Sequence, residues 1–492
     1  MAENEPPRLF GTNGVRGVVN GTIDPLFASR LGLAFSLSLR RKYGAARVKI
    51  GTDTRVSSEM LKSAVVSGLL SGGADVVDIG VSPSPAIQQS VGTDDLCDGG
   101  VIITASHNPP QFNGIKCISA DGTEMSRDEE MEIERLFFSE IYGGDWTEMG
   151  HFSEDYSAND SYMDSIVSQV DAEAIKERHF RVVLDCSNGA ASYTSPYILE
   201  RLGCMLITLN CQPDGFFPGH MSEPTERNLK DTAAVVSALS ADIGIAHDGD
   251  ADRTVFIDET GRYISGNVSL AIFAKYMVRN ALSTAGPAPP VVVTAIDSSS
   301  AVEDVVKEAG GVVKYTRIGS PVVARTMIRE GAMFGGEGNG GAIFSCLHYF
   351  RDGAMSAAKM LEIMARTGKK LSELADEVPV YFQAKDSVDY SSLLTEGGVE
   401  AMSRIKERFM QALEGSIIDT SLHLSFPVTD RNTTDGIKLY VAPSAGETGW
   451  VLIRPSGTEP IIRVASEASD AGTAKKLVSE TREFVLSVMK NL

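Results

Sequence analysis

Residues 101–110, VIITASHNPP, lead a run of β-branched residues into a polar turn that ends in two prolines. Such runs are typical of buried strands, and proline lacks the N–H that a strand ladder needs. Ser106 is therefore expected at a strand end, held by a rigid scaffold and reachable from solvent. A hydroxyl there can carry a phosphoryl group, and His107 and Lys116 are near enough in sequence to serve it. A Ser-His pair in a turn is more often a capping motif. Whether Ser106 carries a phosphoryl group must therefore be judged from the other motifs of the chain.

A strand, an acidic turn and a helix start recur along the chain, at 48–55, 181–189 and 291–299. In the first of these units, helices are expected near 25–42, after the predicted N-cap Ser57 and after Pro85, with a further strand at 76–79. Three similar units indicate a repeated α/β domain. Strands that alternate with helices predict largely parallel or mixed sheets covered on both faces.

From about residue 378 the pattern changes to closely spaced strands, followed by one long amphipathic helix from about Ala471. This predicts a smaller α+β domain with an antiparallel sheet, whose strands are expected at 426–428, 436–441, 450–454 and 461–464. With boundaries in polar or Gly-containing segments, the expected domains are 1–157, 158–260, 261–376 and 377–492.

The composition is that of an ordinary globular protein, with 43% hydrophobic and 22% charged residues. A net charge of −20 argues against nucleic acid as the main partner, because counterion release needs Lys and Arg. No apolar run reaches the ~20 residues that span a bilayer, and the acidic N-terminus lacks signal-peptide features. Six cysteines without a C-x-x-C pair indicate reduced thiols, so a cytoplasmic protein is expected.

The motif Asp248-Gly-Asp250-Ala-Asp252-Arg253 follows an apolar segment at 243–246. Three carboxylates at alternate positions of a tight turn can converge on one hard cation. Three alternatives compete: an EF-hand with Glu259 at its twelfth position, a phosphatase with Asp248 as nucleophile, and a solvated acidic turn. The EF-hand is disfavoured because Arg253 replaces the required glycine and both flanks resemble strands.

Residues 334–341, FGGEGNGG, contain a literal G-x-G-x-x-G, but the following residues continue as a strand, which argues against a dinucleotide site. Glu337 and Asn339 on this glycine loop suit hydrogen bonding to sugar hydroxyls, and a purely structural hairpin is the alternative.

Residues 454–460, RPSGTEP, combine an arginine, two hydroxyls and free backbone N–H groups, which is typical of a phosphate cradle. Arg463 can add a second cation, and the alternative is a simple turn between two strands. No Walker A sequence is present, so the phosphate need not belong to a nucleotide. The opening glycine-rich loop, residues 10–17, can also present Arg16 to an anion, and a simple tight turn is the alternative.

These motifs, in this order, resemble the α-D-phosphohexomutase family of phosphoglucomutases, phosphomannomutases and phosphoglucosamine mutases. The resemblance rests on TASHNP at 104–109, DGDADR at 248–253, GGE at 335–337, RPSGTEP at 454–460 and the opening G-T-x-G-x-R-G. It covers nearly the whole chain. It implies a heart-shaped enzyme in which three related α/β domains with mixed sheets and a C-terminal α+β domain meet at one cleft.

The resemblance also implies one functional loop for each domain. These are the phosphoserine loop at 104–109, the metal loop at 248–253, the sugar loop at 334–341 and the phosphate loop at 454–460. Ser106 would carry the phosphate, and Mg²⁺ would be held by that phosphate with Asp248, Asp250 and Asp252. The cationic and imidazole groups around the transferring phosphoryl group would be Arg16, His107, Lys116 and Arg253. The sugar would be held by Glu337 and Asn339, and its other phosphate by Arg454, Ser456, Gly457 and Thr458, with Arg463 beside them. A hexose 1,6-bisphosphate would be the intermediate and activator.

The sugar loop departs from the family pattern. Many members have Gly-Glu-x-Ser-Gly-His, whereas this chain has Gly341 at the histidine position, and His348 is a possible substitute. The Asn-Gly-Gly form followed by Arg351-Asp-Gly resembles the archaeal branch of phosphoglucosamine and phosphohexose mutases.

The resulting prediction is a Mg²⁺-dependent phosphohexomutase that acts on glucosamine phosphate. Glucose or mannose phosphate comes next, and pentose phosphate is a more distant alternative. Two other classes of function remain: a sugar-phosphate phosphatase, and a non-catalytic paralogue that binds sugar phosphates.

Overall fold

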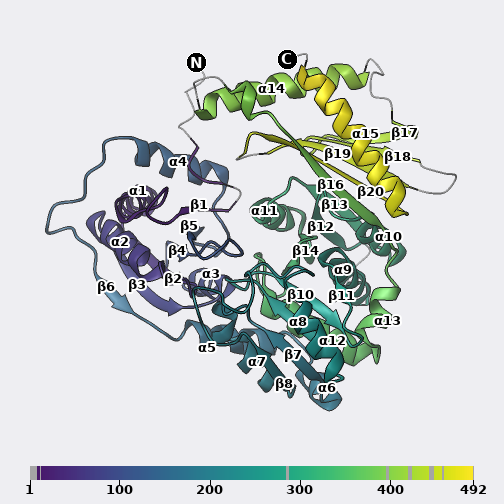
Figure 1. Cartoon of the computed structure of the whole chain (residues 1–492). Helices are drawn as coiled ribbons and strands as arrows, with labels where there is room; N and C mark the ends of the chain where they lie inside the picture. Colours follow the sequence, from purple (N-terminus) through teal and green to yellow (C-terminus); the bar gives the residue numbers. More distant parts are fainter. Residues whose placement is uncertain are drawn as a thin grey trace.

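Four β-sheets follow one another along the sequence in the part of the chain that the structure describes (Figure 1). The structure is a computed structural model that describes residues 8–11, 13–283, 288–394, 398–418, 424–442, 448–456 and 459–490. Each sheet carries the helices that lie next to it in sequence, so Figure 1 shows four lobes around a centre. The predicted fold class, three α/β units and a C-terminal α+β unit with mixed sheets in the former, is confirmed.

The first sheet has the order β1-β5-β4-β2-β3-β6 and both parallel and antiparallel neighbours. Its strands are β1 (Val15–Val18), β2 (Ala46–Thr52), β3 (Ala74–Val81), β4 (Gly99–Ile103), β5 (Phe112–Ser119) and β6 (Phe152–Glu154). Its helices are α1 (Pro25–Tyr43), α2 (Ser58–Ser71), α3 (Ser84–Gly92) and α4 (Arg127–Phe138). Val101 and Ile103 pack into one apolar cluster and Ile102 into another, so β4 is buried on both faces, as its β-branched run predicts.

Two local details differ from expectation. The strand before Ser106 ends at Ile103, because residues 104–106 already form the turn. Ser57 does precede α2, but its hydroxyl makes no capping bond. It accepts a hydrogen bond from the Asn113 amide instead, at 2.9 Å.

The second sheet, β11-β10-β9-β7-β8, and the third, β13-β12-β14-β15, each have a parallel centre and an antiparallel edge. The second contains β7 (Arg181–Asp185), β8 (Met205–Leu209), β9 (Ile243–His247), β10 (Thr254–Asp258) and β11 (Tyr263–Ile264), with α5 (Ala158–Ser168), α6 (Ala172–Arg178), α7 (Ser195–Arg201) and α8 (Lys230–Ala238). The third contains β12 (Val291–Ala295), β13 (Val312–Thr316), β14 (Phe334–Glu337) and β15 (Gly341–Phe344), with α9 (Gly266–Leu282), α10 (Ser300–Glu308), α11 (Ser320–Glu330), α12 (Gly353–Thr367) and α13 (Leu371–Asp376).

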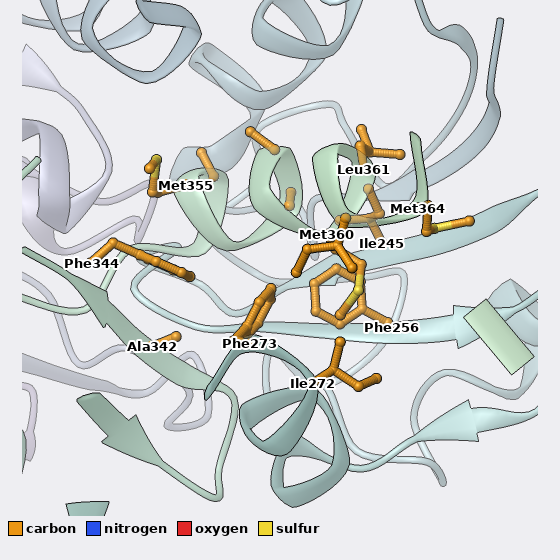
Figure 2. Packing of buried hydrophobic residues seen from close by; sticks show 14 of the residues in the cluster. Ile245, Phe256, Ile272, Phe273, Ala342, Phe344, Met355, Met360, Leu361 and Met364 are labelled. Carbon is orange, nitrogen blue, oxygen red and sulfur yellow. The ribbon is translucent and has the colours of Figure 1, made fainter. Parts of the chain in front are cut away.

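The second and third units share one apolar core (Figure 2). Phe273 of α9 stands edge-on to Phe256 of β10 and Phe344 of β15, with ring centroids 6.0 Å and 5.3 Å apart. Most of α12 is buried around its whole circumference, including Met355, Met360 and Leu361 at its centre. This shared core fixes the turn between β9 and β10 relative to the hairpin of β14 and β15.

The last sheet, β16-β20-β19-β18-β17, is antiparallel throughout, as predicted. Its strands are β16 (Phe382–Asp389), β17 (Val428–Asn432), β18 (Ile437–Val441), β19 (Gly449–Pro455) and β20 (Ile461–Ala468), with α14 (Gly398–Ile418) and α15 (Ala471–Lys490). The sequence did not indicate β16 or α14. The strand expected at 426–428 begins only at Val428.

A buried lysine joins the last two units. Lys438 of β18 is 1% exposed and donates to the Ile296 carbonyl at 2.7 Å. Its ammonium lies 4.2 Å from the ring centre of Trp450 and 5.2 Å from that of Tyr315. Cation–π contacts of this kind offset part of the lost hydration. Burial nevertheless lowers the pKa of Lys438 to about 8.

This burial predicts a specific pH dependence of stability. Between pH 8 and the ordinary lysine pKa of about 10.4, the unfolded chain holds a proton that folded Lys438 has released, so stability rises with pH in this window. We expect the wild type to gain melting temperature relative to Lys438→Met as the pH rises from 8 to 10. A constant difference across this range would show that Lys438 titrates normally.

No helix in the described ranges combines the length and the apolar character needed to cross a membrane.

Candidate active site

Ser106 occupies a strained turn directly after β4. Its φ of 52° lies in the left-handed region, which non-glycine residues seldom adopt, and it is 1% exposed. The backbone N–H of Ser106 donates a hydrogen bond to the Thr104 hydroxyl at 2.9 Å. The Ser106 hydroxyl donates to Asp248 at 2.8 Å and lies 3.3 Å from Nδ1 of His107. Strain at such a position often marks a functional site.

The guanidinium of Arg55 binds the backbone of this turn on the side away from the cleft. It pairs with Asp53 at 3.0 Å and is fully buried. Its N–H groups donate to backbone carbonyls at 2.6–2.9 Å, those of Ser106, Asn108, Pro109 and Phe112. The sequence did not point to Arg55 as a functional residue, although Asp53 lies at one of the recurring acidic turns.

Asp248, Asp250 and Asp252 converge in the turn between β9 and β10, with one oxygen of each within 4.8 Å of the others. All three are buried. The turn approaches the Ser106 loop so closely that a Cβ on Gly249 would lie 2.6 Å from the Ser106 carbonyl oxygen. The glycine in this motif is therefore required by close packing.

One cation from the same loop and two from other units balance these carboxylates. Lys116 of β5 lies 2.8 Å from Asp250 and 3.7 Å from Asp252. Arg253 lies 2.8 Å from Asp248, and Arg351 lies 2.5 Å from Asp252. Burial of such charges is tolerated only when they are paired and hydrogen-bonded.

The acid–base properties of the site follow from burial and these neighbours. Burial raises the pKa of Asp248 to about 6, although Arg253 opposes the rise. Burial acts in the same direction on Asp250, but Lys116 and Ser84 overcome it and hold the pKa of Asp250 below its ordinary value. Burial, Arg253 and Arg16 together lower the pKa of His107 to about 3, so its imidazole is neutral at neutral pH.

The carboxylate trio suits a divalent metal ion. Oδ1 of Asp250 and Oδ1 of Asp252 are buried and accept no hydrogen bond from any described residue. Buried carboxylate oxygens without a partner are costly, and oxygen ligands are those that Mg²⁺ prefers. The EF-hand alternative is wrong, because both flanks are strands and Glu259 accepts hydrogen bonds from Ser372 instead.

A cleft of about 550 Å³ joins the motifs of the first three units. The predicted site residues that line it are Arg16, Ser106, His107, Arg253, Glu337 and Asn339. Arg16 donates to the Ala105 carbonyl and to Asn108, at 3.2 Å and 2.9 Å. Lys116 does not line this cleft: it is only 3% exposed and lies against the carboxylate of Asp250.

The glycine-rich stretch forms a hairpin of the antiparallel strands β14 and β15, so the predicted continuation of this stretch as a strand is confirmed. Glu337 accepts from the Gly319 N–H at 3.0 Å and lies 3.2 Å from Arg351. Asn339 accepts from the Gly341 N–H at 3.1 Å. Arg351 is a further cleft residue that the sequence marked only as a branch feature.

The predicted phosphate loop lies beside a second hollow of about 380 Å³, lined in part by Arg454, Arg463 and Lys385. Arg454 pairs with Asp435 at 3.0 Å, and Arg463 pairs with Glu459. The Ser456 side chain is buried and accepts from the Glu459 N–H at 3.3 Å. Gly457 and Thr458 lie outside the described residues.

Four models of phosphoglucomutase/phosphomannomutase domains match the chain in order: α/β/α domain I at residues 7–142, domain II at 160–261, domain III at 265–381 and the C-terminal domain at 444–484. The chain belongs to this family, the α-D-phosphohexomutases. It is therefore a phosphohexomutase, an enzyme of the isomerase class.

Similar proteins come from archaea and bacteria. A phosphoglucomutase/phosphomannomutase of Thermococcus kodakarensis is 43% identical over 95% of this chain and 96% of the relative. A probable phosphoglucosamine mutase of Methanopyrus kandleri is 38% identical over 97% and 98% of the two chains. A crystal structure of a Burkholderia thailandensis family protein superposes with a TM-score of 0.81 at 26% identity, covering 98% and 97% of the two chains.

The Arg55 contacts predict a strong effect of Arg55→Met on this phosphohexomutase. The change leaves Asp53 as an unpaired buried carboxylate and several loop carbonyls without donors, which destabilises the fold by about 3–5 kcal/mol. A shift of about 1 Å in the Ser106 loop lowers kcat about 100-fold. Thermal melting and steady-state kinetics test this. Arg41→Met, at an exposed ion pair with Glu132, is the matched control and should change neither.

Proposed function

We propose that the protein is a Mg²⁺-dependent phosphohexomutase that interconverts hexose 1-phosphates and 6-phosphates through a phosphoserine at Ser106. The observation that carries this proposal is the contact of the strained Ser106 hydroxyl with Asp248, 2.8 Å away at the edge of the carboxylate trio. The same cleft contains the cations and the sugar loop that phosphoryl transfer requires.

Asp248, Asp250 and Asp252 would hold the Mg²⁺ ion, together with the phosphate on Ser106. The ion supplies neutralisation of the charge that develops on the transferring phosphoryl group. Arg16, Lys116 and Arg253 add fixed positive charge around the same group, so the chain provides a preorganised environment for transfer. The phosphoryl group itself adds about −1.5 to −2 charges beside His107, which favours proton uptake by the imidazole.

In the first half-reaction, the phosphoryl group leaves the Ser106 oxygen for a free sugar hydroxyl, the proton of that hydroxyl passes to a neighbouring base, and the serine oxygen becomes a hydroxyl. The product is a hexose 1,6-bisphosphate. After this molecule turns over in the cleft, its other phosphoryl group returns to Ser106 and the proton is given back. His107, 3.3 Å from the serine oxygen, is the candidate proton carrier.

Binding of the sugar and of its second phosphate would fall to the two remaining loops. Glu337 and Asn339 would bind the sugar hydroxyls. The phosphate would be held by Arg454, Ser456, Gly457, Thr458 and Arg463. With these roles, the four domains that we propose, 1–157, 158–260, 261–376 and 377–492, each contribute one loop to substrate binding or phosphoryl transfer.

Glucosamine phosphate is the proposed substrate, because its ammonium group would be attracted to the buried carboxylate of Glu337 in the sugar loop, and because the Methanopyrus kandleri relative is named as a probable phosphoglucosamine mutase. Glucose or mannose phosphate is the second candidate, favoured by the name of the 43% identical Thermococcus kodakarensis relative.

The serine assignment predicts that Ser106→Ala abolishes isomerisation, with a loss of at least ~1,000-fold, because the phosphoryl carrier is gone. ³¹P NMR with Mg²⁺, a trace of hexose 1,6-bisphosphate and the 1-phosphates of glucosamine, glucose, mannose and ribose measures conversion and ranks the sugars. Ser90→Ala, in α3, is the matched control and should remain active.

Other results would favour the other classes of function. Release of inorganic phosphate that survives Ser106→Ala would indicate a phosphatase with Asp248 as nucleophile. Wild-type protein that binds hexose phosphates without converting any of them would indicate a binding paralogue.

Removal of divalent metal ions should abolish activity reversibly. After treatment with EDTA, the oxygens of Asp250 and Asp252 that accept no hydrogen bond from a described residue remain buried, and the transferring phosphoryl group loses the charge neutralisation that the ion would supply. We expect loss of isomerisation by at least ~100-fold and recovery on adding Mg²⁺. Full activity in the chelator would contradict the metal assignment.

A further inference from the structure

The side chain of Arg351 fills the space above Gly341. A Cβ placed on Gly341 would lie 2.3 Å from Cδ of Arg351, far inside van der Waals contact. Gly341 stands where many family members have histidine, so a histidine and this arginine conformation exclude each other. The sugar loop of this chain is therefore built around the arginine.

Arg351 connects two loops that belong to different sheets. Its Nη2 donates to Asp252 in the metal loop at 2.5 Å, and its Nη1 donates to Glu337 in the sugar loop at 3.2 Å. The side chain lines the cleft and is 8% exposed. A guanidinium has a rigid fork of donors, so it can fix two carboxylates relative to each other in a way that a single ammonium cannot.

The backbone of Arg351 is itself held in place. The next residue, Asp352, donates its N–H to the Ala342 carbonyl at 3.0 Å, caps α12 by accepting from the Met355 N–H, and accepts from the Tyr162 hydroxyl at 2.7 Å. His348 also binds Asp352, at 2.9 Å, and does not line the cleft. His348 is therefore placed to support the loop and does not replace the family histidine.

We propose that Arg351 is a positioning residue that ties Glu337 of the sugar loop to Asp252 of the metal loop, and that its side chain occupies the space that a histidine at position 341 would need. This inference rests on the proposed roles of Glu337 and Asp252. Arg351 acts on the substrate through Glu337: it holds that carboxylate at a fixed distance from the phosphoryl-transfer centre.

A double-mutant cycle on binding tests this tie without turnover. In the Ser106→Ala background, which is held in the unphosphorylated form, calorimetry with Mg²⁺ measures the Kd of glucosamine 6-phosphate and glucose 6-phosphate for Arg351→Met, Glu337→Gln and the double variant. We expect each single change to weaken binding at least tenfold, and the double variant to be no more than about threefold weaker than the weaker single variant. Multiplicative effects would overturn the proposal.

Arg351→Lys separates a two-point tie from simple charge. A lysine keeps the positive charge but reaches one carboxylate at a time, so we expect at least a threefold weakening of binding and a raised KM in the otherwise wild-type enzyme. If the Arg351→Lys protein had the same Kd and the same KM as the protein with Arg351, the proposed two-point contact would be overturned. Arg366→Met, at an exposed ion pair with Asp171, is the matched arginine control and should change neither quantity.

Steric exclusion has its own test, read by melting temperature and independent of any substrate. Gly341→Ala should lower the melting temperature clearly when Arg351 is present and by much less in the Arg351→Ala background, where Cδ is absent. Equal losses in the two backgrounds would show that Arg351 does not fill this space. If no hexose phosphate binds at all, the proposed function fails, while this steric result still stands on its own.

Discussion

Three carboxylates are buried together in the turn between β9 and β10, and this arrangement sets the main electrostatic requirement of the fold. Asp248, Asp250 and Asp252 lie within one short turn at almost no exposure, an arrangement that repulsion and desolvation would forbid without compensation. Compensation comes from three directions: Arg253 in the same loop, Lys116 from the first sheet and Arg351 from beyond the third. The charge balance of the site therefore requires three units of the chain to meet there.

The same requirement explains how closely the loops pack. Gly249 allows the metal loop to touch the Ser106 carbonyl, and Gly341 leaves space for Arg351. On the opposite side of the serine turn, Arg55 binds backbone carbonyls, so the turn keeps its positive φ without help from the cleft. The backbone of the Ser106 turn is thus held by an arginine that does not line the cleft, which is a form of preorganisation.

Contacts between units differ in kind. The second and third share a continuous apolar core around Phe273, which resists relative movement because close-packed side chains have few alternative arrangements (Figure 2). The last sheet meets the third at a smaller cluster of Ile296, Trp450 and Leu452, beside buried Lys438. This interface therefore combines apolar packing with one buried polar contact.

The sequence determined those features that depend on near neighbours in the chain. β-Branched runs, prolines and the alternation of strands and helices indicated the fold class, and the order of the motifs at Ser106, Asp248–Asp252 and Glu337 indicated the candidate site. It did not indicate α14 or β16, of which β16 is mostly exposed and shows no clear alternation. It also predicted Ser57 as an N-cap, whereas the Ser57 hydroxyl accepts a hydrogen bond from the Asn113 amide.

Only the tertiary structure revealed the roles of Arg55, Arg351 and Lys438. Each is a long cationic side chain with at least one partner far away in the sequence. The separation is 51 residues from Arg55 to Ser106, 99 from Arg351 to Asp252 and 142 from Lys438 to Ile296. In a sequence such a residue looks like any surface arginine or lysine. Its role depends on which buried oxygens and aromatic rings lie next to it in the folded chain. The local sequence predicts turns and periodic elements, but it does not specify which distant residues come together in space.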